Sequence, residues 1–211
     1  YKRQSLHYYL SIIRCAEFFH KKVFIYSQGI GPIDRPGNRR AAAAALKRAD
    51  GIVVRDERSA ALLEEIGIAR DKVVITADPV IRMKKPDGDV GAEILRKAGV
   101  SLDGRLTVGW AIRERDTDSR FVKELLRSIQ MMKDKYNAQS VLIPFHYEED
   151  GEVCRHIAAQ LPDDTAVCLN EKYLSEDMLS IIGNMDLLVG VRLHSLIYAA
   201  IMGVPLIGIS Y

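Results

Sequence analysis

Short apolar runs alternate with longer amphipathic stretches along the first part of this chain. Residues 23–27, 51–55 and 73–76 have the length and apolar character of strands that are buried on both faces. Residues 39–48 and 58–66 lie between these runs and have helical length and spacing. Strands that alternate with helices predict a parallel sheet whose connections are right-handed crossovers.

The same alternation restarts after a polar segment with Pro and Gly at residues 82–89, which we interpret as a linker. The elements expected here and at the N-terminus are helices 4–21, 90–98, 120–136, 152–161 and 195–202, a helix capped by Ser175, and strands 106–112, 140–145, 166–169, 187–191 and 206–209. We therefore expect an α/β protein with two Rossmann-like, doubly wound parallel-sheet halves. The halves are residues 1–83 and 84–211, and the cleft between their strand ends is the expected binding site.

The last of these strands and helices hold the strongest candidates for chemistry. Arg192 and His194 follow the strand at 187–191 and precede a helix that Gly203 and Pro205 end. Ligands of open parallel sheets bind beyond the carboxyl ends of the strands, and a helix start favours anions. We expect Arg192 to clamp an anion and His194 to act as a general acid. The alternative is that Arg192 pairs with a surface acid and that His194 caps the helix.

Other candidate binding residues also lie at strand ends or helix starts. The pairs Arg55–Glu57 and Asp56–Arg58 could equally be surface ion pairs, and the arginine at 113 begins a charged loop. The full set of expected substrate-binding residues is Arg55, Arg58, Arg113, Gln28, Gly29, Gly31, Asp78, His146 and Ser195.

Composition excludes several other classes of protein. The chain is 48% hydrophobic and 27% charged, and its net charge of +2 argues against a nucleic-acid partner. Three cysteines without a metal-ligand spacing indicate a reducing compartment, no disulfide framework and no metal site. No apolar run is long enough to span a bilayer, and no Walker loop or dinucleotide fingerprint is present. Because the chain begins without Met, inside a helical pattern, we expect it to be part of a longer protein.

Four segments in order resemble the polysaccharide pyruvyl transferase family, and its CsaB branch most of all. The segments are Tyr26-Ser-Gln-Gly-Ile-Gly-Pro-Ile33, Val53-Val-Arg-Asp-Glu-Arg-Ser59, Ala77-Asp-Pro-Val80 and Val189-Gly-Val-Arg-Leu-His-Ser followed by the rest of the chain to Tyr211. The resemblance implies a GT-B-like fold. It also implies transfer of a pyruvyl group from phosphoenolpyruvate to a sugar, giving a pyruvate ketal and phosphate.

The resemblance extends to partners and residues. It implies a lipid-linked acceptor with N-acetylmannosamine, destined for the cell-wall polymer that anchors S-layer proteins. No cofactor is implied, since phosphoenolpyruvate is a co-substrate, and the expected location is cytoplasmic, at the inner face of the membrane with peripheral contact. Arg192 and His194 match the family's phosphoenolpyruvate-binding Arg-Leu-His, and Arg55 or Arg58 matches an arginine of its first half. The family's Gly-rich N-terminal start and a lysine beyond Tyr211 fall outside this chain.

Two other functions remain open on the sequence. One is a GT-B glycosyltransferase that uses a nucleotide sugar, although Tyr198 stands where such enzymes hold the ribose with a carboxylate. The other is a non-catalytic module that binds sugars or anions, since a fold does not determine a function.

Overall fold

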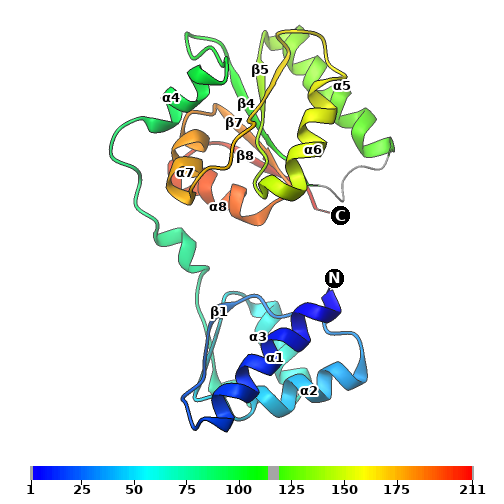
Figure 1. Cartoon of the computed structure of the whole chain (residues 1–211), viewed down its shortest axis with the longest axis vertical. Helices are drawn as coiled ribbons and strands as arrows, with labels where there is room; N and C mark the ends of the chain where they lie inside the picture. The colour runs from blue at the N-terminus through cyan, green and yellow to red at the C-terminus, as the bar shows by residue number, and fades with distance from the viewer. Residues whose placement is uncertain (1, 114–118, 211) are drawn as a thin grey trace. The chain divides into compact units, whose positions relative to one another are not determined.

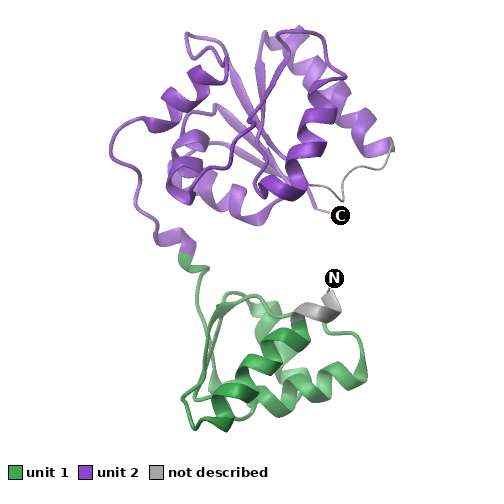
Figure 2. Cartoon of the chain, viewed as in Figure 1, with its two compact units in different colours: residues 1–79 green, residues 80–211 purple. Residues whose placement is uncertain are grey.

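The computed structural model describes residues 2–113 and 119–210 and is an α/β protein with two parallel sheets (Figure 1). The chain divides into two compact units, which are residues 1–79 (unit 1) and 80–211 (unit 2; Figure 2). Each unit has its own sheet and its own hydrophobic core. The predicted fold class is confirmed.

Unit 1 is built on a three-stranded parallel sheet in the order β1-β2-β3. Its elements are α1 Lys2–Phe18, β1 Phe24–Gln28, α2 Pro36–Leu46, β2 Gly51–Val54, α3 Glu57–Glu65, η1 Arg70–Lys72 and β3 Val73–Ile75. Side chains of all three helices pack in one core with the buried residues Ile52 and Val54 of the middle strand. Strand β1 exposes Phe24 and Tyr26, and β3 exposes Val74.

Unit 2 has a five-stranded parallel sheet in the order β6-β5-β4-β7-β8. Its elements are η2 Pro79–Arg82, α4 Val90–Lys97, β4 Thr107–Ala111, α5 Ser119–Tyr136, β5 Gln139–Leu142, α6 Tyr147–Ala158, β6 Ala166–Cys168, α7 Ser175–Gly183, β7 Leu187–Gly190, α8 Leu193–Met202 and β8 Leu206–Gly208. Residues 83–89, between η2 and α4, form no helix or strand. Figure 1 shows α4, α7 and α8 on one face of the sheet and α5 and α6 on the other.

Helices pack on both faces of this sheet, so its central strands β4, β5 and β7 are largely buried, whereas the edge strand β8 is exposed. One core packs α4, α7 and α8 against residues such as Val141 and Leu188, and the other packs α5 and α6 against Val108 and Leu142. The chain runs outward through β4, β5 and β6 and then returns to place β7 on the other side of β4. The strand order therefore reverses between β4 and β7, and the carboxyl ends of these two strands are neighbours. Such a switch point is where open α/β sheets bind ligands.

Several predicted helix starts are wrong. Helix α2 begins at Pro36 rather than at residue 39, since proline suits the first turn of a helix, and α8 begins at Leu193 rather than at residue 195. Two further errors come from acidic side chains. Helix α6 begins at Tyr147 rather than at residue 152, because an acidic first turn suits the positive end of a helix. One of its acids, Asp150, accepts a hydrogen bond from the backbone N–H of His146 at 2.9 Å. Helix α7 has Leu174 as its N-cap, so Ser175 is not the cap. The Leu174 N–H donates instead to the Asp177 carboxylate, at 3.4 Å.

None of the helices in the described ranges combines the length and the apolar character needed to cross a membrane.

Candidate functional site

Four predicted residues of unit 2 lie where its central strands end. Arg113 follows β4, His146 follows β5, and Arg192 and His194 follow β7. These three strands are neighbours in the sheet, with β4 in the middle. Arg113 and Arg192 are half-buried, whereas His146 and His194 are exposed. Residues 114–118, which continue the predicted charged loop, lie outside the described part of the chain.

The Arg192 guanidinium lies against two acids of α6. Its Nε and Nη2 donate to the two carboxylate oxygens of Asp150, at 3.2 and 2.5 Å, and Nη2 also donates to Glu149 at 3.3 Å. Burial lowers the pKa of Arg192, but hydrogen bonds and charge from both acids raise it above its ordinary value on balance. Arg192 is therefore ion-paired, as the alternative interpretation expected, although its main partner is fully buried rather than on the surface.

The turn between β7 and α8 sets the position of Arg192. Arg192 is the N-cap residue of α8, so His194 is not the cap and lies in the first turn. Ser195 is fully buried, and its hydroxyl donates to the Arg192 carbonyl oxygen at 2.6 Å. Gly190 ends β7 so close to this turn that an added Cβ would lie 2.5 Å from the Ser195 Oγ. Ser195 thus shapes the turn from inside. As predicted, Gly203 ends the helix, with a φ of 78°.

His146 faces the same acidic turn of α6. Its Nδ1 lies 3.8 Å from Glu149 and 3.9 Å from Glu148, and Glu148 also pairs with Lys172 at 2.8 Å. This ion pair with Lys172 holds the pKa of Glu148 below its usual range. The three acids of this turn are not among the site residues predicted from the sequence. The run Glu148-Glu149-Asp150 directly after His146 was the available signal, but the helix was expected to begin later.

Predicted residues of unit 1 also meet at the carboxyl ends of its strands. The Arg55 guanidinium, at the end of β2, donates from Nη1 to Asp78, which follows β3, at 2.8 Å. A Cβ on Gly29 would lie 2.6 Å from the Arg55 guanidinium, so glycine permits this close approach. Gln28 precedes Gly29 at the end of β1, and its backbone carbonyl accepts the Arg55 N–H at 3.3 Å.

The loop after β1 is tied to the start of α3. The Ile30 N–H donates to Ser59 Oγ at 2.9 Å, and Asp56 caps α3 by accepting the Ser59 N–H at 2.7 Å. Gly31 has a φ of 122°, where a side chain would be strained. Arg58 is exposed on the first turn of α3. Of the two candidate arginines, Arg55 is thus the one built into the strand-end cluster.

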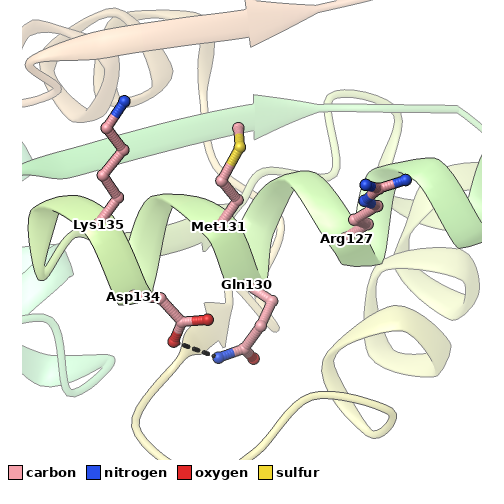
Figure 3. A pocket seen from close by; sticks show the side chains of 5 residues that line it. All are labelled: Arg127, Gln130, Met131, Asp134 and Lys135. Atoms are coloured by element: carbon pink, nitrogen blue, oxygen red, sulfur yellow. Dashed lines mark hydrogen bonds between the residues drawn. The ribbon is translucent and has the colours of Figure 1, made fainter.

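Two surface hollows among the described residues lie elsewhere. One is lined by side chains on the outer surface of α5: Arg127, Gln130, Met131, Asp134 and Lys135 (Figure 3). Gln130 donates to Asp134 at 2.8 Å across one side of it. A second, between α2 and α3, is lined by Arg39, Arg40, Ala43, Ala44, Lys47, Glu65 and Ile66. Neither contains a predicted site residue. The titratable groups gather instead at the strand ends, where open parallel sheets bind ligands.

Metal-ligand geometry is not found in the described ranges. Within them, no group of three or more His, Cys, Asp or Glu residues is arranged to hold a metal ion. The three cysteines are free thiols, and Cys154 is buried.

Comparison with known proteins gives a family for the chain. A family model described as polysaccharide pyruvyl transferase matches residues 2–211. No curated protein sequence matches.

The solved structures that match share the fold at low identity. HepE from Anabaena, in complex with UDP and glucose, is 13% identical with a TM-score of 0.64, and the match covers 94% of this chain and 56% of HepE. UDP-GlcNAc 2-epimerase from Methanocaldococcus jannaschii is 14% identical with a TM-score of 0.66, covering 94% and 57%. UDP-GlcNAc 2-epimerase from Neisseria meningitidis, bound to UDP-GlcNAc, is 16% identical with a TM-score of 0.62, covering 94% and 56%. The chain thus has a GT-B-like fold and spans a little over half the length of these proteins.

Proposed function

Because this chain belongs to the polysaccharide pyruvyl transferase family, we propose that it transfers the pyruvyl group of phosphoenolpyruvate to two hydroxyls of one sugar. The products are a cyclic pyruvate ketal and inorganic phosphate. Both new bonds join a sugar oxygen to the central carbon of the enol, and the bond from that carbon to the phosphate oxygen breaks. Of the two hydroxyl protons, one balances the proton gained by the methylene carbon and one leaves with phosphate.

The observation that carries this proposal is the position of Arg192 and His194 at the switch point of unit 2. Phosphoenolpyruvate has a carboxylate and a phosphate, and a guanidinium binds either group through paired N–H donors. Within the part of the chain that the structure describes, Arg192 donates to α6 through Nε and Nη2, which leaves Nη1 for a ligand. Arg113 follows the neighbouring strand β4 and is the second candidate cation.

His194 is the candidate acid. It is exposed in the first turn of α8, two residues after Arg192 in the sequence. Imidazoles commonly act as general acids, and His194 would deliver a proton to the methylene carbon or to the departing phosphate. The buried Ser195 hydroxyl stabilises the turn between β7 and α8 through its hydrogen bond to the Arg192 carbonyl oxygen.

The finer features of the proposal follow the resemblance. The acceptor is a lipid-linked saccharide with N-acetylmannosamine, used for the cell-wall polymer that anchors S-layer proteins. The reaction takes place in the cytoplasm at the inner face of the membrane, with peripheral membrane contact and no cofactor. In unit 1 the cluster of Gln28, Gly29, Arg55 and Asp78 offers amide, guanidinium and carboxylate groups of the kind that bind sugars and anions.

Phosphate release from phosphoenolpyruvate by the intact enzyme, with a panel of synthetic lipid-linked disaccharides, tests this proposal. We expect release only with a suitable acceptor. His194→Ala should lower kcat by about 10²- to 10⁴-fold, the usual contribution of a general acid, while phosphoenolpyruvate still binds. Thermal stabilisation by phosphoenolpyruvate at a hundredfold excess over its Kd should reach about 2.7 kcal/mol.

Stabilisation by UDP-sugars alone would instead indicate a nucleotide-sugar glycosyltransferase. Tyr198 argues against that alternative, because its side chain is buried and packs on Phe145, with ring centroids 5.4 Å apart. Binding of phosphoenolpyruvate without turnover on any acceptor would indicate a binding module.

A further inference from the structure

Asp150 is a buried carboxylate that joins two loops at the strand ends of unit 2. It lies in the first turn of α6 and is 0% exposed. One oxygen accepts Nη2 of Arg192 at 2.5 Å, and the other accepts both Nε of Arg192 at 3.2 Å and the His146 N–H at 2.9 Å. The loop after β5 and the loop after β7 are therefore connected through this one side chain.

The pairing with Arg192 is bidentate and leaves one edge of the guanidinium open. Asp150 takes the fork formed by Nε and Nη2, which is a planar match for a carboxylate. Glu149 reaches only the second N–H of Nη2, at 3.3 Å, from a side chain that is 38% exposed. Within the described residues, Nη1 donates no hydrogen bond to a protein group. Because Asp150 holds Nε and Nη2, the planar guanidinium group also has its Nη1 edge fixed in one direction.

The two acids therefore have different relations to an anionic ligand. A ligand that binds Nη1 and Nη2 together meets Glu149 as a competitor, but it does not need to displace Asp150. Both acids lower the local positive charge, so simple electrostatics predicts tighter anion binding when either is neutralised. Orientation predicts the opposite result for Asp150, because a free guanidinium must be ordered when the ligand binds.

We propose that Asp150 is a positioning residue of the transfer site, and this inference rests on the proposed function. Its carboxylate holds Nε and Nη2 of Arg192, so that the Nη1 edge is set to receive the anionic donor. Asp150 does not touch the donor and acts through Arg192.

The test uses the intact enzyme and compares Asp150→Asn with Glu149→Gln, the matched control on the neighbouring residue. All assays are run at a temperature where circular dichroism shows each variant to be folded. We expect Asp150→Asn to raise the KM for phosphoenolpyruvate at least tenfold and to leave the KM for the acceptor within twofold. Glu149→Gln should leave the KM for phosphoenolpyruvate unchanged or lower it. An unchanged or lower KM in Asp150→Asn would overturn the proposal.

A double-mutant cycle separates positioning from a general role in the fold. Arg192→Met removes the guanidinium, so adding Asp150→Asn should cause no further loss in kcat/KM for phosphoenolpyruvate. Losses that multiply in the double variant would mean that Asp150 acts independently of Arg192 and would contradict the inference. If Asp150→Asn does not fold, Asp150→Glu replaces it. This variant keeps the buried charge but displaces the guanidinium. A wild-type KM for phosphoenolpyruvate in Asp150→Glu would also contradict the inference.

A readout that needs no turnover keeps this inference distinct from the proposed function. In ¹⁵N-labelled protein, the Arg192 Nε–H resonance should be visible and slow to exchange in the wild type and in Glu149→Gln, and lost in Asp150→Asn. If the wild type releases no phosphate with any acceptor, the proposed function fails. The positioning of Arg192 is then judged by this resonance alone, and its persistence in Asp150→Asn would refute it.

Discussion

Replacement of Gly190 by alanine should disturb the turn that carries Arg192 and His194. A Cβ at this position would lie 2.5 Å from Ser195 Oγ and 3.0 Å from Leu196 Cδ2, both closer than ordinary van der Waals contact. The leucine methyl can rotate away. The serine hydroxyl cannot move freely, because it is fully buried and donates to the Arg192 carbonyl oxygen at 2.6 Å.

The size of the effect follows from these contacts. Overpacking of a close-packed site costs about 1–3 kcal/mol. An alanine in place of glycine within a strand recovers about 0.5–1 kcal/mol of backbone entropy. We therefore expect Gly190→Ala to lower the free energy of unfolding of unit 2 by about 1–2 kcal/mol, and its Tm by about 3–8 °C.

Denaturant unfolding followed by circular dichroism measures this loss, and Ser195→Ala supplies the control. Without the serine Oγ the added methyl group has space, although loss of the buried hydrogen bond itself costs about 1 kcal/mol. Gly190→Ala should therefore cost less than half as much in the Ser195→Ala background as in the wild type. Equal costs in both backgrounds, within about 0.5 kcal/mol, would refute the steric reasoning.

Two other predictions concern helix packing and capping. Gly91→Ala places a Cβ 2.3 Å from the backbone of Ser180 and should destabilise unit 2 by about 2 kcal/mol or more in denaturant unfolding. In the control Gly151→Ala, the new Cβ meets the flexible end of an exposed arginine at 3.2 Å and the Tyr147 ring at an ordinary contact distance of 3.8 Å. This variant should be neutral or stabilising by up to about 1 kcal/mol; the same sign for both would contradict this. Burial raises the pKa of Asp56, but its hydrogen bonds with Ser59 and nearby arginines hold it below 3.8 on balance. The stability that ionised Asp56 contributes to the fold is therefore present above pH 3.8 and is lost as the pH falls through the folded-state pKa of this group. Asp56→Ala should cost about 1 kcal/mol at pH 7, and the difference from wild type in pH-dependent unfolding should vanish at lower pH; a pH-independent difference would be evidence against this.

The sequence by itself determined the order and type of the elements and the residues at strand ends. Short apolar runs such as residues 187–191, set between helix-length amphipathic stretches, favour buried strands, and in parallel sheets every strand ends on the same edge. That is why Arg55, Arg113, His146 and Arg192 could each be predicted to follow a strand without knowledge of which strands are neighbours. The end of helix α8 at Gly203 could also be predicted from the sequence. A glycine stop depends on the φ angle of that one residue and not on distant contacts.

Only the tertiary structure decided which of these side chains meet. The return of the chain that places β7 beside β4 is a long-range choice, and it brings Arg192 to Asp150, 42 positions away in the sequence. The pairing of Arg55 with Asp78 likewise depends on β2 and β3 being adjacent. An ion pair needs geometry within a few ångströms, and sequence spacing sets such geometry only within a single helix or turn.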